Sequence, residues 1–123
     1  MNNLNSVLIE GVVTDYRQGE REVKIASQRW YRSGNTFKNK ITVVPIRMDN
    51  DKLRSLVEHR LVKGTGVRVV GRLDDYIGSQ GRVFYIDAEH IEVQKEYPIP
   101  EEKTLTEEEC LDGEDVSARE GEE

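Results

Sequence analysis

Short stretches of alternating apolar and polar residues account for most of this chain, and one stretch with helical spacing interrupts them. Branched and aromatic side chains at every second position are typical of strands, whereas a stripe with a period of three to four residues is typical of a helix. The helix is expected at Asp51–Leu61, between the third and fourth strands. The predicted strands are Leu4–Thr14, Glu22–Gln28, Phe37–Arg47, Gly66–Asp75 and Arg82–Val93.

Three strands, a short helix and two further strands are the element order of the OB-fold, a small Greek-key barrel that binds oligonucleotides or oligosaccharides. The sequence therefore predicts an all-β fold, a five-stranded OB-fold barrel with its helix between strands three and four. Pro98 and Pro100 end the strand pattern, so the domain is expected to span residues 1–97.

The charge is unevenly distributed along the chain. Residues 1–100 hold 16 Lys and Arg against 13 Asp and Glu, whereas residues 101–123 hold 2 against 11. The formal net charge of −6 therefore hides a mildly cationic body. The C-terminal part has too few apolar residues to bury, so residues 98–123 are expected to form a disordered acidic tail.

Several classes of protein are disfavoured by composition. The single cysteine, Cys110, cannot form an internal disulfide, which fits a reducing compartment. The N-terminal residues lack the basic and apolar regions of a signal peptide, and no apolar run could span a membrane. His59 and His90 are isolated, so neither a metal site nor a catalytic group is predicted. We expect a cytoplasmic protein with no cofactor and no enzymatic activity.

Aromatic and cationic residues stand side by side in the two predicted hairpin loops, Arg29–Asn35 and Asp74–Gly81. An exposed aromatic ring can stack an unpaired base of any identity, and Arg or Lys can contact the neighbouring phosphates. This combination points to single-stranded nucleic acid as the ligand.

Several motifs, in this order and spacing, resemble the bacterial single-stranded DNA-binding protein family over roughly residues 4–94. They are Asn5–Gly11, Ser27–Trp30, Lys63–Leu73 and Asp87–Val93. The resemblance implies an OB-fold, a homo-oligomer (commonly a tetramer) and sequence-tolerant binding of single-stranded DNA. It also implies a role in DNA replication, recombination and repair.

Trp30 matches the family's stacking Trp, and Tyr76 matches an aromatic position in its last hairpin loop. The alternatives are a Trp that caps the barrel core and a Tyr packed on a neighbouring subunit. Phe84 and Tyr85 lie on opposite strand faces, and we assign Phe84 to the core and Tyr85 to a base or an interface. Any single cation also fits an ordinary solvated charge. The predicted nucleic-acid contacts are Arg29, Trp30, Tyr31, Arg32, Lys38, Lys40, Arg68, Arg72, Tyr76, Arg82 and Tyr85.

The C-terminus departs from the family pattern. Family members typically end in acidic residues followed by a hydrophobic tip with Phe, which recruits replication and repair proteins. This chain ends in Ala118–Glu123, with the acidity but without the aromatic tip. We expect the tail to compete with DNA for the cationic groove.

Two other functions fit the same fold. One is a dimeric primosome accessory protein, and the other is an OB-fold adaptor that binds protein or RNA. The mass in solution distinguishes the dimeric accessory protein from a tetramer. Quenching of Trp30 fluorescence by oligo-dT distinguishes a DNA-binding protein from the adaptor.

Overall fold

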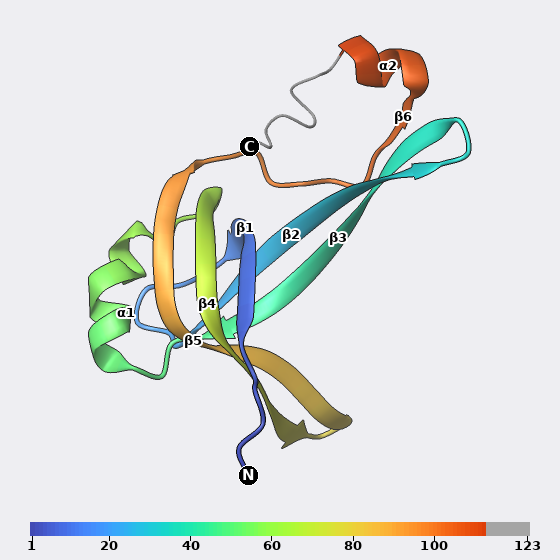
Figure 1. Cartoon of the computed structure of the whole chain (residues 1–123). Coiled ribbons are helices and arrows are strands. Elements are labelled where there is room, and N and C mark those ends of the chain that lie inside the picture. The colour runs from blue at the N-terminus through green and yellow to red at the C-terminus, as the bar shows by residue number, and fades with distance from the viewer. Residues whose placement is uncertain (113–123) are drawn as a thin grey trace. The chain divides into compact units, whose positions relative to one another are not determined.

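The computed structural model describes residues 1–112 (Figure 1). The strands are β1 (Val7–Asp15), β2 (Glu22–Ser33), β3 (Thr36–Arg47), β4 (Thr65–Gly78), β5 (Gly81–Glu96) and β6 (Thr104–Thr106). The helices are α1 (Asp51–Val57), which continues into a 3₁₀ turn at Glu58–Arg60, and α2 (Glu107–Asp112). The predicted order of three strands, a helix and two strands is confirmed.

The strands close into a barrel through a mixed set of pairings. Their order is β2-β1-β4-β5-β3, and β2 also pairs with β3, which completes the circle. The β3–β5 pairing is parallel, with Ile46 opposite Ile86, whereas β1 pairs antiparallel with both β2 and β4. This closed five-stranded topology is the OB-fold, as the sequence predicts.

The chain forms two compact units. The first, here called the barrel body, comprises residues 1–27 and 43–99. The second, here called the arm unit, comprises residues 28–42, which form the outer parts of β2 and β3, together with the segment from Pro100 onward.

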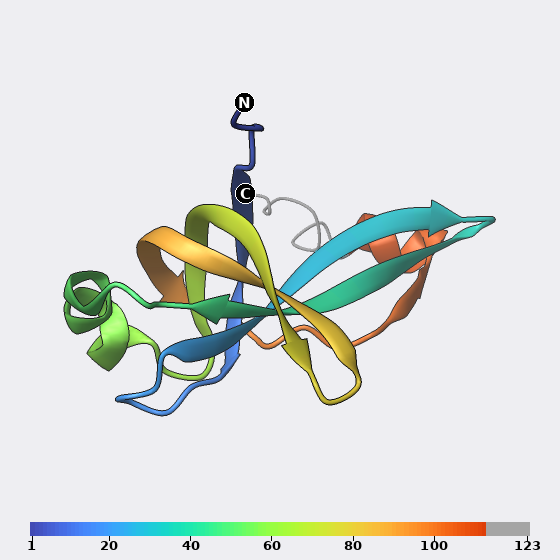
Figure 2. The ribbon, with the colours of Figure 1, turned by 90° about the horizontal axis from the view of Figure 1, so that it is seen from below.

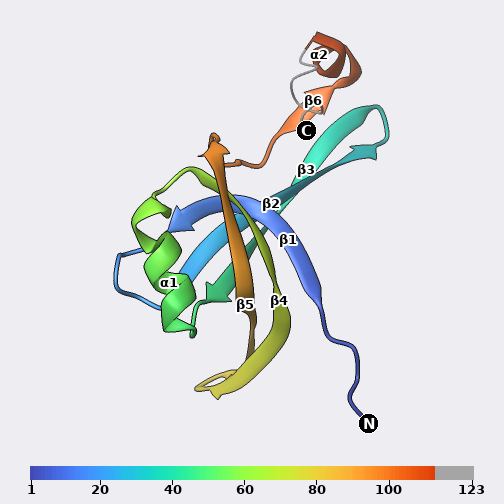
Figure 3. The same ribbon diagram turned by 60° about the vertical axis from the view of Figure 1, so that its left-hand side comes forward.

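The core lies in the barrel body and follows from strand alternation. Its largest fully buried side chains are Val13, Ile25, Ile46, Met48, Val67 and Val69. Helix α1 lies beside β5 (Figures 1 and 3) and adds Leu53 and Val57 to the core, one helical turn apart. Leu56, which lies between these two residues in the helix, is 65% exposed, so the buried face of the helix is narrow.

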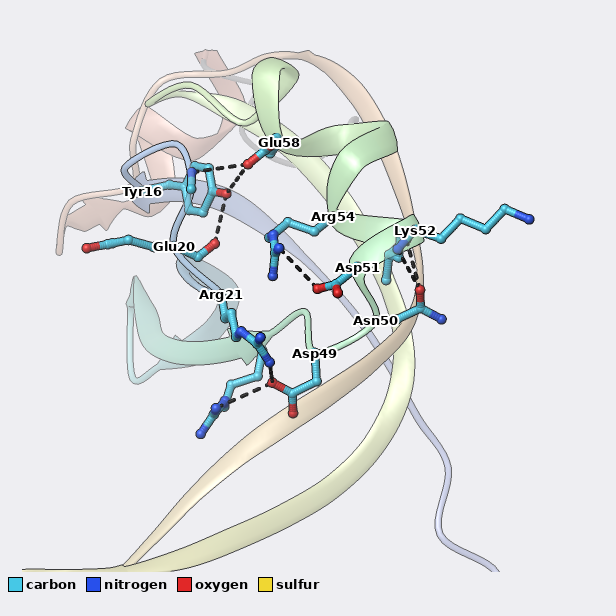
Figure 4. A network of polar contacts seen from close by, with 12 residues as sticks. Tyr16, Glu20, Arg21, Asp49, Asn50, Asp51, Lys52, Arg54 and Glu58 are labelled. Carbon is cyan, nitrogen blue, oxygen red and sulfur yellow. Dashed lines mark hydrogen bonds and ion pairs between the residues drawn. The ribbon is translucent and has the colours of Figure 1, made fainter.

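The helix begins where the sequence predicts. The Asn50 side chain accepts hydrogen bonds from the backbone N–H groups of Lys52 and Leu53, which have no partner inside the helix. Figure 4 shows this cap and a second contact that ties the helical region to the β1–β2 loop. There, Gly19 N–H donates to Glu58 Oε1 over 3.1 Å. Within the loop itself, the Tyr16 hydroxyl donates to Glu20 O over 3.0 Å. Partial burial and the Glu58 carboxylate raise the pKa of Tyr16, so its hydroxyl remains a donor.

Both long hairpins extend further than the sequence predicts. The turn between β2 and β3 is only Gly34-Asn35, and β4 and β5 are joined by Ser79-Gln80. Gly34 has φ +63°, and Gly81, which follows the second turn, has φ +122°. Short hairpin turns depend on such positive φ values, which Gly adopts at little cost. Residues 29–32 and Tyr76 therefore lie on strands rather than in loops. Figure 2 shows the β4–β5 hairpin as a long two-stranded ribbon.

Two short elements lie in the segment for which the sequence predicts no regular structure. Strand β6 pairs antiparallel with β3, with Phe37 opposite Leu105, and α2 follows directly. Thr-Leu-Thr is a β-prone tripeptide, and it adds a strand along the edge of β3. Residues 113–123 of the predicted acidic tail lie outside the described residues.

Within residues 1–112, none of the helices is both long and apolar enough to cross a membrane. In the same part of the chain, no group of three or more His, Cys, Asp or Glu side chains could hold a metal ion.

Candidate nucleic-acid interface

The arm unit divides its aromatic and cationic residues between two faces. The Asn39 amide nitrogen donates to Gln28 Oε1 over 2.7 Å, and the Arg32 guanidinium lies 5.4 Å from the centre of the Phe37 ring. These contacts place the even-numbered residues of β2 on the same face as Phe37 and Asn39 of β3. Trp30 belongs to this face, here called the tryptophan face, and is half-buried.

The C-terminal segment is anchored on the tryptophan face. Asn39 is 7% exposed, and its amide nitrogen also donates to Glu101 O over 2.7 Å, while its amide oxygen accepts from Lys103 N–H over 2.6 Å. Arg32 Nη2 lies 2.7 Å from a carboxylate oxygen of Glu107. The predicted contacts Trp30 and Arg32 therefore share their face with residues 101–107.

The opposite face of the arm, here called the tyrosine face, carries Arg29 and Tyr31 from β2 with Lys38 and Lys40 from β3. Tyr31 is 39% exposed, and the Arg29 guanidinium lies 5.5 Å from the centre of its ring. Among the described residues, none of the three cations forms an ion pair with a carboxylate. This face therefore presents an aromatic ring among cations whose charge is available to a phosphate.

In the barrel body, the two predicted tyrosines meet on one face of the β4–β5 ribbon. The ring centres of Tyr76 and Tyr85 are 6.0 Å apart at an angle of 44°. The guanidinium of Arg47, at the end of β3, lies 5.1 Å from the centre of the Tyr85 ring. Tyr76 is 46% exposed and Tyr85 is half-buried, so Tyr76 offers the more open ring.

Tyr85 is a neutral phenol in this environment. Partial burial raises its pKa above the usual value, and the Asp74 carboxylate opposite it in the ladder raises the pKa further, while Arg47 acts in the other direction. A neutral ring avoids repelling a nearby phosphate.

The predicted cations of the barrel body are each held by carboxylates. Arg68 stands between Glu10 and Glu92 in the strand ladder, at 2.7 and 3.6 Å, and the hydrogen bond to Glu10 raises the pKa of its guanidinium. The other two pair with neighbours on the β4–β5 ribbon: Arg72 with Asp87 and Glu89 at 3.7 and 3.4 Å, and Arg82 with Asp75 at 2.7 Å.

The assignment of Phe84 to the core is wrong. Phe84 is 54% exposed, and Leu73 and Ile77 on the same face of the ribbon are 49% and 69% exposed. Ile86 and Ala88 are buried as expected. The alternation was correct, but the ribbon continues past the barrel, so its outer residues have no core to face.

Sequence reasoning also missed Arg47, whose guanidinium stands over the Tyr85 ring. The signal for Arg47 was weak, because it follows the buried Ile46 at the end of a strand and lies 38 positions before Tyr85 in the numbering. Only the parallel β3–β5 pairing, with Arg47 opposite Asp87, brings it to the ribbon.

Comparison with known proteins gives matches in structure only. No family model and no curated protein sequence matches the chain. The mitochondrial single-stranded DNA-binding protein of S. cerevisiae is 18% identical, over 78% of this chain and 100% of that one, with a TM-score of 0.59. The Plasmodium falciparum protein, solved in complex with single-stranded DNA, is 19% identical over 76% of this chain and 96% of that one, also with a TM-score of 0.59.

A deletion variant of the single-stranded DNA-binding protein from Thermus aquaticus is 20% identical over 75% of this chain and 51% of that one, with a TM-score of 0.61. At these identities the likeness concerns the fold. It matches the fold that the sequence motifs imply.

Proposed function

We propose that this protein binds single-stranded DNA with little sequence preference and catalyses no reaction. The observation that carries the proposal is the tyrosine face of the arm, where Tyr31 stands among three cations that have no carboxylate partner within residues 1–112. Trp30 on the other face adds a second aromatic surface. We further propose that the protein acts in the cytoplasm, in DNA replication, recombination and repair.

The chemistry of such a surface favours unpaired strands over duplex DNA. Bases in a duplex are stacked on one another, whereas an unpaired base gains about 1–3 kcal/mol by stacking on an aromatic side chain. Each phosphate that a cation neutralises releases counterions, so the logarithm of the binding constant falls with the logarithm of salt concentration by about 0.7 per contact.

The proposed DNA contacts fall into three groups, according to the chemistry of each side chain and whether it starts in an ion pair. Stacking is assigned to the four aromatic side chains Trp30, Tyr31, Tyr76 and Tyr85. Direct phosphate contact is assigned to the three cations of the tyrosine face, namely Arg29, Lys38 and Lys40. A further group begins in ion pairs and would have to exchange a carboxylate for a phosphate: Arg32, Arg68, Arg72 and Arg82.

We propose that the protein is a homo-oligomer, with the tetramer as the expected form. Strand β1 pairs with β2 only from Val12 onward, so the preceding residues have no strand partner on that side within the described chain. Leu8, which lies on this segment, is 67% exposed. An unpaired strand edge with an exposed apolar side chain favours pairing with a second copy. Light scattering at several concentrations tests this assembly.

The proposed function is tested by fluorescence anisotropy of labelled oligo-dT mixed with the full chain at low salt. We expect saturable binding to oligo-dT and to mixed-sequence single strands, and much weaker binding to a duplex of the same length. Equal binding to duplex and single strand, or no binding to either, would contradict the proposal. Tighter binding to an RNA strand than to oligo-dT would favour the adaptor function.

A further inference from the structure

The ion-pair clusters of the barrel body differ in their balance of charge. Arg68 and Arg72 each face two carboxylates, and Arg82 faces one. One cluster has the opposite balance: two arginines, Arg21 and Arg47, share the single carboxylate of Asp49. Among the ion pairs of residues 1–112, this is the cluster in which cations outnumber carboxylates, and the remaining positive charge attracts an anion.

The backbone brings the two arginines together. Met48 N–H donates to Arg21 O over 2.7 Å, which aligns the start of β2 with the end of β3. The loop that precedes Arg21 is in turn tied to Glu58 through Gly19 N–H (Figure 4). The two guanidinium groups therefore approach each other from two anchored segments, even though their like charges repel.

The ion pairs that Arg21 and Arg47 form with Asp49 are long. One carboxylate oxygen, Oδ1, lies 3.8 Å from Arg21 Nη1 and 3.4 Å from Arg47 Nη2. A well-formed ionic hydrogen bond between such groups is about 2.7–2.9 Å long. The side chains of Arg21, Arg47 and Asp49 are 55%, 32% and 42% exposed. Both guanidinium groups thus keep donors for another anion, and solvent reaches the site.

The aromatic neighbours indicate which anion fits. Arg47 stands over the Tyr85 ring, and Tyr85 contacts Tyr76, whose ring is the more exposed of the two. A phosphate at the arginines and a base on the tyrosines are the two parts of one short stretch of nucleic acid. Guanidinium groups favour phosphate because their planar N–H donors match two of its oxygens.

We propose that Arg21 and Arg47 form a phosphate-binding subsite for a phosphodiester of single-stranded DNA, in which Asp49 occupies the position of the incoming phosphate oxygen. The subsite rests on the proposed function and adds contacts that the sequence did not predict. The phosphate enters between the two guanidinium groups and the Asp49 carboxylate moves out toward solvent.

The test is the salt dependence of oligo-dT binding by full-length variants. Arg21→Gln and Arg47→Gln are each expected to weaken binding several-fold at low salt and to lower the slope of log K against log salt by about 0.7. Asp49→Asn is expected to strengthen binding, because it removes the competing carboxylate and keeps the side-chain shape. Arg47→Lys retains the charge, so it is expected to keep the slope. Arg60→Gln is the matched control: this exposed arginine lies in the 3₁₀ turn, outside the proposed DNA contacts, and the slope is expected to stay that of the wild type.

The possible results distinguish a failure of the proposed subsite from a failure of the proposed function. If the wild type binds oligo-dT but the Arg21 and Arg47 variants keep its slope, the subsite is wrong and the proposed function stands. A wild type that binds no oligo-dT overturns the proposed function, and the subsite with it. Thermal unfolding of each variant confirms that a weakened affinity does not come from loss of the fold.

Discussion

The arm and the β4–β5 ribbon are built alike and differ in charge. Each is a hairpin with a two-residue turn, and each carries aromatic rings that are at least partly open to solvent. On the tyrosine face of the arm, the cations have no carboxylate partner among the described residues. On the ribbon, Arg72 and Arg82 are held by acidic residues of the same hairpin.

This difference shows that the number of cations on a hairpin does not by itself locate a phosphate-binding surface. Side chains directly opposite each other on paired strands interact, and a Glu or Asp in that position takes up the charge of an Arg. Arg68 illustrates this, since Glu10 and Glu92 are its partners in the ladder on either side. Within residues 1–112, the cation that stands over a ring of the ribbon is Arg47, which comes from another strand and shares the Asp49 carboxylate with Arg21.

The largest expected effect is on the stability of the fold, and it distinguishes a core residue of the barrel body from a binding residue of the arm. Ile25 is fully buried in the barrel body, so Ile25→Ala is expected to lower the free energy of unfolding by about 2–5 kcal/mol. Trp30→Ala, in the arm unit, is expected to change that free energy far less, because Trp30 is only half-buried. Chemical denaturation of both variants measures the contrast. Equal destabilisation would mean that Trp30 serves the core rather than the ligand.

Trp30→Ala is also expected to weaken binding of oligo-dT by about 5–150-fold, because a base loses about 1–3 kcal/mol of stacking. Trp30→Phe keeps an aromatic ring and is expected to restore most of the affinity. Anisotropy titrations at fixed salt measure both. An unchanged affinity in Trp30→Ala would remove the tryptophan face from the interface.

Tyr76→Ala tests whether the ribbon takes part, and a several-fold loss of affinity is expected. Tyr97 provides a matched control, because it is 41% exposed against 46% for Tyr76 and also lies beside a cation, Lys95. It stands after the end of β5 and away from the tyrosine pair in sequence. Equal losses in Tyr76→Ala and Tyr97→Ala would indicate a general effect on the barrel body.

Removal of residues 101–123 is expected to tighten DNA binding several-fold at low salt, and less at high salt. The deletion removes the segment anchored by Asn39 on the tryptophan face and frees Arg32 from Glu107. Glu107→Gln, which only frees Arg32, is expected to produce part of the gain. Salt titrations of the two variants test this, and weaker binding after the deletion would mean that the segment supports the arm.

The sequence predicted the parts of this fold that depend on local patterns. Alternating apolar residues predict the strand order, and the helical spacing from Asp51 onward predicts the beginning of α1. The sequence predicts hairpins that are too short, because the residues of Arg29–Asn35 are typical of a loop, although Gly34 and Asn35 alone suffice for the turn. Because residues 29 and 30 lie on strand β2 and not in a loop, the side chains of Arg29 and Trp30 point to opposite faces of the arm.

The sequence names candidate contact residues but not their surroundings. The contact between Tyr76 and Tyr85 is not among its predictions, because it follows from the antiparallel β4–β5 register. The partners of the cations depend on contacts between distant segments, such as Arg68 with Glu10 and Arg32 with Glu107. No local pattern carries that information.

The central claim is that bases of single-stranded DNA stack on the aromatic rings of both faces of the arm, on Trp30 as well as on Tyr31. The chain has one tryptophan, so its intrinsic tryptophan fluorescence reports on Trp30 alone. A titration with oligo-dT at low salt is expected to quench this fluorescence strongly and to saturate at a defined number of nucleotides per chain. Saturated binding in the anisotropy assay without any change in Trp30 fluorescence would contradict the claim.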